Sequence, residues 1–271
     1  MLRGRNEEAI GALQKAQGIS STEATKAIEL MASLSATATP EPGAAEVEDN
    51  VITKIKEITS SPYNRRALLI GVGLVLFQQL SGQPSVLYFA NRIFETAGLG
   101  YEAALGVGVF KLIMTLVSAQ LVENPKYGRR TLLLYGNIAV TAALGSLALL
   151  YSFGPAGAVT QAAIIASILL FVGGYQIGFG PITWLILSEI FPLRVRSAAL
   201  SCGTLANFAS NLLVTGLFEV ERQSLGEGLL FSQFGVIAVL ATWFTYAFVF
   251  ETQGLSLEQI EAKLKVTVDG E

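Results

Sequence analysis

Six long apolar segments restrict the fold of this chain more than any other feature. They cover residues 67–94, 103–122, 131–153, 161–187, 198–217 and 229–250. Each reaches the roughly 20 residues that an α-helix needs to cross a bilayer. The connecting loops are short, so the backbone hydrogen bonds must be made inside each segment, which only helices allow. We therefore expect an all-α membrane protein with a bundle of six transmembrane helices.

The composition excludes several classes of function. Charged residues make up 14% of the chain, against roughly 25% in soluble domains, and the net charge of -3 offers no basic surface for nucleic acid. There is no histidine, and Cys202 is the only cysteine. Histidine-dependent catalytic triads, the usual zinc sites and an internal disulfide are therefore ruled out. The sequence predicts no enzymatic activity, cofactor, metal ion or nucleic-acid partner.

Polarity divides the chain into three parts. Residues 1–66 are polar, with short amphipathic helices expected around 9–13, 28–34 and 51–58 and a linker at 37–46. Residues 67–250 form the predicted bundle, and residues 251–271 form a polar tail. Eight of the 18 basic residues precede the bundle, and most others lie in the second loop, the fourth loop and the tail. The positive-inside rule then places both termini in the cytosol.

Amide side chains occur inside two of the predicted spans. The first span contains Gln78 and Gln79, followed by Pro84, which should kink or break the helix. The fifth span carries Asn207 and Asn211 four residues apart, and therefore on one helical face. Amides both donate and accept hydrogen bonds, which suits a ligand covered in hydroxyl groups. The alternative is that they hold neighbouring helices together.

Two further spans contain unusual residues. In the fourth span, Gln176 and Trp184 flank a Gly-Phe-Gly-Pro sequence that predicts a broken helix. A tryptophan can pack against a sugar ring, although a lone one is also a common packing or interfacial residue. Lys111 lies within the second span, where a charge needs a partner or water. It is a ligand-site group, an amine that exchanges protons, or a side chain that snorkels to the interface.

Four motifs resemble signatures of the sugar porters of the major facilitator superfamily, in the order found in their carboxy-terminal half. They are FQQLSGQPSVLYFANRIF at 77–94, YGRRTLL at 127–133, GPITWLILSEIFPLRVRSAAL at 180–200 and ETQGLSLEQIE at 251–261. The resemblance extends to plant and algal proton-linked glucose carriers of the vacuolar or plastidic type. It implies the carboxy-terminal half of a major facilitator fold, preceded by a cytosolic helical linker at residues 1–66.

The resemblance also implies roles for individual residues. The substrate-binding residues would be Gln78, Gln79, Lys111, Gln176, Trp184, Asn207 and Asn211. Tyr88 matches a gating aromatic residue, and the cytoplasmic charge network that locks the inner gate would comprise Arg129, Arg130, Glu189 and Arg196. The arginines also set the topology. Pro84 and Gln176 replace an asparagine and an acidic residue of many glucose carriers, so the site is not a copy of theirs.

The implied function is transport of a hexose-like monosaccharide, linked to protons, by alternating access. This chain would supply the sugar-binding half and would pair with an amino-terminal six-helix half, from the same gene or a separate chain. The alternatives are a membrane sugar sensor or regulatory half-transporter without flux, and a truncated carrier without function. The membrane could be the plasma, vacuolar or plastid membrane.

Overall fold

The computed structural model describes residues 20, 22, 25–26, 51–96 and 100–269. The chain divides into two compact units, Met1–Asn50 and Val51–Glu271. The helices expected around 9–13 and 28–34 and the linker at 37–46 lie outside the described residues. The boundary expected at residue 66 stays a prediction.

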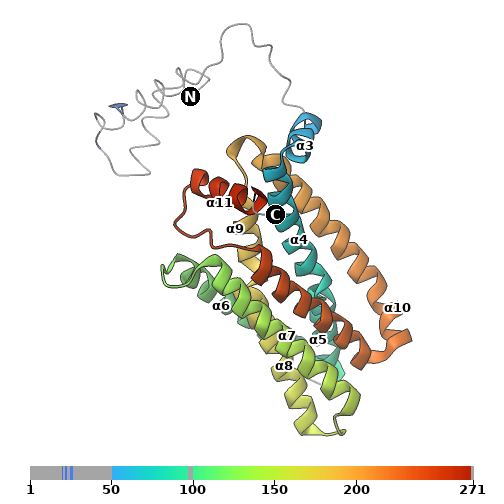
Figure 1. Ribbon diagram of the computed structural model, residues 1–271. Coiled ribbons are helices and arrows are strands. Elements are labelled where there is room, and N and C mark those ends of the chain that lie inside the picture. Colours follow the sequence, from blue (N-terminus) through green and yellow to red (C-terminus); the bar gives the residue numbers. More distant parts are fainter. Residues whose placement is uncertain (1–19, 21, 23–24, 27–50, 97–99, 270–271) are drawn as a thin grey trace. The chain divides into compact units, whose positions relative to one another are not determined.

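The described part of the second unit is helical and contains no strand (Figure 1). Its helices are α3 (Val51–Ser60), α4 (Pro62–Leu80), α5 (Gln83–Thr96), α6 (Gly100–Glu123), α7 (Arg129–Phe153), α8 (Ala158–Ile177), α9 (Phe179–Glu189), α10 (Leu193–Phe248) and α11 (Leu257–Asp269). The short helix predicted around 51–58 is α3. The tail includes α11, which packs against α4.

The predicted apolar segments correspond to these helices. The second and third segments are α6 and α7, and the first and fourth are each divided into two helices, α4 with α5 and α8 with α9. The fifth and sixth segments are two arms of α10. Within the described chain, five stretches are long and apolar enough to cross a membrane, and the last is the whole of α10. The all-α membrane fold is therefore confirmed, with two predicted spans inside that last stretch.

The helix α10 turns back on itself at Gly226. A straight helix of its 56 residues would be ~84 Å long, far longer than the ~30 Å hydrocarbon core of a bilayer. Gly226 has φ 75° and ψ 166°, outside the helical range. Gln233 Nε2 donates to Glu221 Oε1 at 3.4 Å although the two residues are 12 positions apart. Figure 1 shows the resulting first arm (orange) and second arm (red) running in opposite directions.

The first span is interrupted at Ser81 and Gly82, between α4 and α5. Gly82 has φ +84°, which residues with a side chain rarely adopt, and a Cβ atom there would lie 2.6 Å from the ring of Phe234. Pro84 lies in the first turn of α5, where its missing N–H is not needed. The break predicted near the proline is confirmed, with α4 ending at Leu80.

Glycines allow α7 to pack closely against α8. A Cβ atom on Gly136 of α7 would lie 2.6 Å from the carbonyl oxygen of Gly174 and from Cα of Gly178. Gly178 also separates α8 from α9, with φ -96° and ψ -92°. Small residues permit this approach of backbones, which stabilises membrane helices where lipid provides no hydrophobic driving force between them. The second helix break therefore lies where α7 contacts α8.

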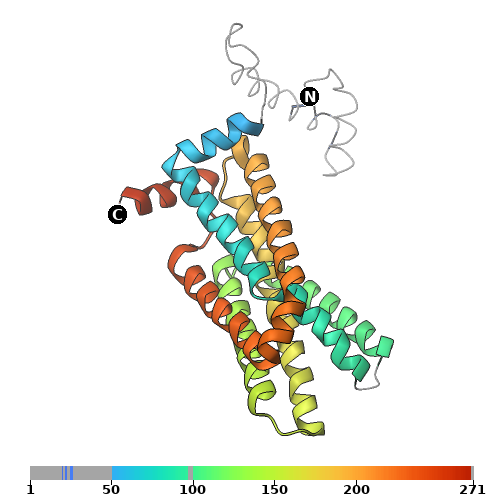
Figure 2. The same ribbon diagram turned by 90° about the vertical axis from the view of Figure 1, so that its right-hand side faces the viewer.

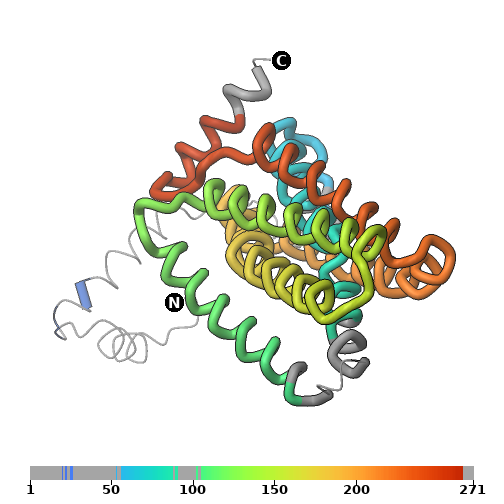
Figure 3. Tube along the Cα trace, turned by 90° about the horizontal axis from the view of Figure 1, so that it is seen from below, coloured from blue at the N-terminus to red at the C-terminus, as the bar shows by residue number. Residues whose placement is uncertain are grey.

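The helix α6 lies at the edge of the bundle. In its most apolar stretch of 18 residues, only 11% is buried. The corresponding stretches of α4, α7 and α8–α9 are 50–61% buried. Figures 2 and 3 show α6 (green) set apart from the helices that surround the core. The largest fully buried side chains include Phe171, Phe179, Phe191 and Phe231. The apolar outer face of α6 is left for lipid or for a partner.

Candidate functional site

Three amide side chains meet beside the break in the first span. Gln79 Nε2, near the end of α4, donates to Asn207 Oδ1 on the first arm of α10. Asn211 Nδ2, one helical turn further along that arm, donates to Gln79 Oε1 at 3.3 Å. Gln79 is buried, and both asparagines are partly buried. We call these three residues the amide triad.

The neighbouring Gln78 is engaged with another helix. Its Nε2 donates to the carbonyl oxygen of Phe179 at 2.8 Å, directly after the break between α8 and α9. The Gln78 side chain is 3% exposed, and its Oε1 has no hydrogen-bond partner among the described residues. Gln78 therefore links the two broken spans and keeps one free acceptor.

Gln176 faces α6 and not the amide triad. Its Nε2 donates to Thr115 Oγ1 at 2.6 Å, and Thr115 Oγ1 donates to the carbonyl oxygen of Lys111 at 2.8 Å. One turn further along α6, Ser118 Oγ donates to the carbonyl oxygen of Ile177 at 3.4 Å. Gln176 is therefore joined to α6 through Thr115, and Lys111 takes part through its backbone carbonyl oxygen and not through its amine.

The remaining residue predicted to bind substrate is Trp184, and Tyr88 is the predicted gating aromatic residue. Trp184 on α9 is partly buried and packs against the core. The side chain of Tyr88 lies outside the described part of α5. The structure therefore brings together Gln79, Asn207 and Asn211 and links Gln78 to the break between α8 and α9. It bonds Gln176 to Thr115 on α6, and no contact places the Lys111 side chain of the described chain in either group.

The amide triad can bind a ligand by exchange of hydrogen bonds. Each amide has two N–H donors and an oxygen acceptor, and in the triad two hydrogen bonds join the three side chains across α4 and α10. A polyhydroxyl ligand could replace these contacts without leaving a buried amide unpaired, which would otherwise be costly. Within the described residues, no group of three or more histidine, cysteine or acidic side chains is placed to hold a metal ion.

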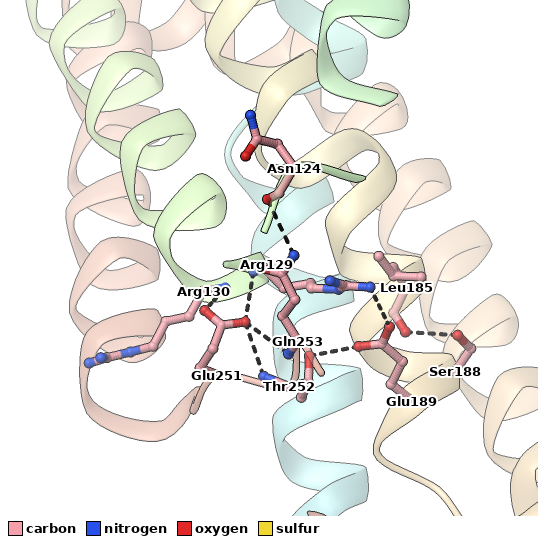
Figure 4. A network of polar contacts seen from close by, with 9 residues as sticks. All are labelled: Asn124, Arg129, Arg130, Leu185, Ser188, Glu189, Glu251, Thr252 and Gln253. Carbon is pink, nitrogen blue, oxygen red and sulfur yellow. Dashed lines mark hydrogen bonds and ion pairs between the residues drawn. The ribbon is translucent and has the colours of Figure 1, made fainter. Parts of the chain in front are cut away.

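A charged network lies at the end of the bundle where α7 begins (Figure 4). We define it as Arg129, Arg130, Glu189, Glu251 and Thr252. Glu251 accepts the backbone N–H groups of Arg129 at 2.8 Å and of Arg130 at 3.2 Å. A carboxylate at this position satisfies orphan donors of the α7 N-terminus and interacts well with its dipole. Glu251 also accepts the backbone N–H groups of Thr252 and Gln253, both at 3.1 Å.

The side chain of Arg129 connects α7 to α9. Its Nη2 lies 3.3 Å from Glu189 Oε1, and the two side chains are only 17% and 24% exposed. Thr252 Oγ1 donates to the other oxygen of Glu189 at 2.6 Å. Gln253 Nε2 donates to the carbonyl oxygen of Asn124 at 3.3 Å, which holds the α6–α7 loop. Four parts of the chain are therefore joined at one end of the bundle.

The other two predicted gating arginines bind backbone oxygens. Arg130 Nη2 donates to the carbonyl oxygen of Tyr246 at 2.8 Å, and the guanidinium lies 5.4 Å from the Tyr246 ring centroid. Arg196 Nε and Nη2 both donate to the carbonyl oxygen of Phe191, at 3.2 and 3.1 Å. Of the four predicted residues, the structure pairs Arg129 with Glu189, and Arg196 stabilises the α9–α10 connection.

The sequence did not indicate a site at Glu251, Thr252 or Thr115. Glu251 stands at the start of the motif at 251–261, directly after the last apolar segment, and this acidic residue was the available signal. Thr115 gave no signal, since a threonine within an apolar helix usually bonds its own backbone, as this one also does. Glu123, at the end of α6, is exposed.

Comparison with known proteins identifies the family of this chain. Residues 1–264 match the family described as "Sugar (and other) transporter". The protein named "D-xylose-proton symporter-like 1" of Arabidopsis thaliana is 47% identical over 206 residues, which cover 73% of this chain and 39% of the relative. "Glucose transporter GlcP" of Staphylococcus epidermidis is 32% identical over 270 residues, which cover 98% of this chain and 56% of the relative. The chain thus spans about half the length of such relatives, or less.

Solved structures of the xylose transporter XylE are similar to this fold. The inward open conformation of XylE from E. coli matches with a TM-score of 0.68 at 28% identity, over 95% of this chain and 50% of that chain. The proton:xylose symporter XylE bound to 6-bromo-6-deoxy-D-glucose also gives 0.68 at 28% identity, over 97% and 52%. The chain is an integral membrane protein that belongs to the sugar transporter family of the major facilitator superfamily, a family of transporters and not of enzymes.

Proposed function

We propose that this chain supplies the sugar-binding half of a carrier that moves a hexose-like monosaccharide by proton-linked alternating access. The observation that carries the proposal is the amide triad, which joins two helices beside a break in one of them. Transporter sites of this kind lie near the bilayer midplane and use discontinuous helices. Relatives named for xylose-proton symport and for glucose transport support a pyranose substrate and proton linkage.

The proposed site is completed by a second six-helix half. The first arm of α10 carries two of the triad amides together with exposed Leu205, Phe208 and Leu212. Polar groups facing hydrocarbon are costly, so a protein partner or a wet cavity is expected to cover this face. An amino-terminal half, in the same or a separate chain, would provide the opposite wall.

The test is sugar uptake by an assembled carrier. The chain would be co-expressed with the amino-terminal half of D-xylose-proton symporter-like 1 in cells that lack sugar uptake, and entry of labelled glucose and xylose would be measured. Asn211→Ala removes one hydrogen-bonding amide of the triad and should lower uptake efficiency about tenfold. Gln161→Ala removes an exposed amide at the start of α8 and serves as the control. Uptake that is insensitive to Asn211→Ala would refute the proposed sugar site.

Two further measurements separate the proposed mechanism from its alternatives. Proton linkage requires that uptake rises when the outer medium is acidified and disappears with a protonophore. Sugar binding without flux in liposomes containing both halves would identify a sensor and contradict a carrier. Failure of both binding and flux, with both halves present and folded, would indicate a carrier without function.

The charged network is proposed to act as a gate. Alternating access requires contacts that hold one state and break in the other, and the Arg129–Glu189 pair joins α7 to α9 at one end of the bundle. Glu189→Gln should slow transport while sugar binding is retained. Glu123→Gln, which changes an exposed carboxylate at the end of α6, is the matched control. Equal transport by both variants would exclude the gate.

A further inference from the structure

An apolar groove lies between α7 and the second arm of α10, and no residue of the amide triad lines it. It has a volume of about 670 Å³ and is lined from α7 by Leu134, Tyr135, Ile138, Thr141 and Ala142, and from α10 by Val239, Thr242, Trp243 and Tyr246. Figure 3 shows the two helices lying side by side, α7 in light green and the arm in red. No residue predicted to bind sugar contributes to it.

The lining of this groove faces outward. Tyr135, Ile138, Trp243 and Tyr246 are 53–68% exposed in the chain, and the two threonines at its floor bond to each other and to their own helices. In an integral membrane protein an apolar surface of this kind suits contact with the acyl chains of lipid. Tyrosine and tryptophan side chains are typical of the region where the acyl chains meet the headgroups.

A polar cavity adjoins one end of the groove, and Tyr246 lines both. The cavity has a volume of about 300 Å³ and is lined by Arg66, Arg130, Glu251 and apolar residues of the α10 terminus and α11. Arg66 already has an interaction within the protein, which leaves Arg130 as the basic group of this cavity for a ligand. The oxygens of Glu251 already accept four backbone N–H groups. The carboxylate in the cavity is therefore already hydrogen-bonded within the protein.

Arg130 has a donor without a partner in the described part of the chain. Its Nη2 bonds the carbonyl oxygen of Tyr246 and its guanidinium lies against the Tyr246 ring, but its buried Nε has no hydrogen-bond partner among the described residues. Buried polar groups are nearly always paired. The fork of N–H donors on a guanidinium matches the oxygens of a phosphate group. The position of Arg130 is therefore suited to an anionic group at the mouth of the groove.

We propose that these two cavities together bind one anionic phospholipid. Its phosphate would bind Arg130, and an acyl chain would lie in the groove between α7 and α10. Occupancy would fix Arg130, whose backbone N–H is held by Glu251 in the charged network. The lipid would thus bind beside the proposed gate, in cavities that no residue of the amide triad lines.

The test uses the full chain in nanodiscs of phosphatidylcholine that contain a phosphatidylglycerol with a photoreactive acyl chain. After illumination, labelled peptides are identified by mass spectrometry. We expect labels within residues 134–142 and 239–246 that are displaced by unlabelled phosphatidylglycerol and not by phosphatidylcholine. Labelling to the same extent by a photoreactive phosphatidylcholine would overturn the proposal, because it would show unselective contact with bulk lipid. Displacement by a sterol and not by phosphatidylglycerol would overturn it as well.

Matched variants locate the two parts of the site. Arg130→Gln should reduce labelling about fivefold, the effect expected for one basic residue at an anionic membrane surface. Lys126→Gln removes the same charge from an exposed position in the adjacent loop and should leave labelling unchanged. Ala142→Phe fills the groove and should abolish labelling there, whereas Ala166→Phe on the exposed side of α8 should not. Equal labelling of Arg130→Gln and Lys126→Gln chains would refute a phosphate contact at Arg130.

Discussion

The carboxylate of Glu251 combines two roles at the scale of a single residue. It accepts N–H groups at the start of α7, which places Arg129 beside Glu189, and it accepts N–H groups of the chain that leaves α10. A helix N-terminus and a loop therefore depend on one charged group. Loss of that charge should loosen both, whether or not any sugar is bound.

We predict that Glu251→Gln lowers the free energy of unfolding by about 1 kcal/mol, as expected for loss of a charged group that caps a helix. The variant retains the size of the side chain, so the effect reports the charge and its hydrogen bonds. Denaturant titration of the purified chain in detergent measures the change. Glu123→Gln, at an exposed position nearby, should be neutral. If the two variants unfold alike, Glu251 does not stabilise the start of α7.

The pair Gln176 and Thr115 permits a second prediction at this scale. Their side-chain hydrogen bond of 2.6 Å joins α8 to the peripheral α6. Hydrogen bonds between membrane helices contribute about 0.6 kcal/mol on average in double-mutant cycles, and we expect a coupling of about that size between Gln176→Leu and Thr115→Val. The cycle is measured by the same unfolding titration. Strictly additive effects would show that the bond contributes nothing.

At the scale of the helices, sequence and structure agree where length and backbone chemistry decide the outcome. The apolar segments, the break before Pro84 and the break around Gly178 follow from residue type alone. The partners of individual side chains do not follow from residue type. Gln79 bonds to residues that are 128 and 132 positions away, and Gln176 bonds to a residue that is 61 positions away. The amide positions were therefore predictable, whereas the division into a triad and a separate Gln176–Thr115 cluster was not.

The contact of α7 with α8 gives a prediction for two glycines of one helix. In Gly136→Ala the new Cβ atom would lie 2.6 Å from backbone atoms of Gly174 and Gly178, which cannot rotate away. Overpacking of this kind costs about 1–3 kcal/mol. Gly145→Ala places its Cβ in open space and should be neutral or slightly stabilising, since alanine favours helix over glycine. Thermal unfolding of both variants in detergent checks the difference, and equal stabilities would contradict the close contact.

At the scale of the whole molecule, the unequal covering of the bundle indicates where a second half would pack. Phe208 and Leu212 on the first arm of α10 are 68% and 76% exposed, and they lie among the amides of the triad. Leu149 and Phe153 on α7 are similarly exposed, at 62% and 82%, but no amide of the triad lies on that helix. A lipid environment suits the second pair, whereas the first pair shares its helix with polar groups that lipid cannot satisfy.

We therefore predict that Phe208→Ala combined with Leu212→Ala weakens pairing with an amino-terminal half about tenfold, as expected for loss of well-packed interface side chains. Leu149→Ala combined with Phe153→Ala removes the same two side-chain types from α7 and should leave pairing unchanged. Pairing is measured by titrating a fluorescently labelled amino-terminal half of D-xylose-proton symporter-like 1 into nanodiscs that contain the chain. Weakening by the α7 pair and not by the α10 pair would place the partner on the opposite face, and the amide triad would then face lipid instead of a sugar path.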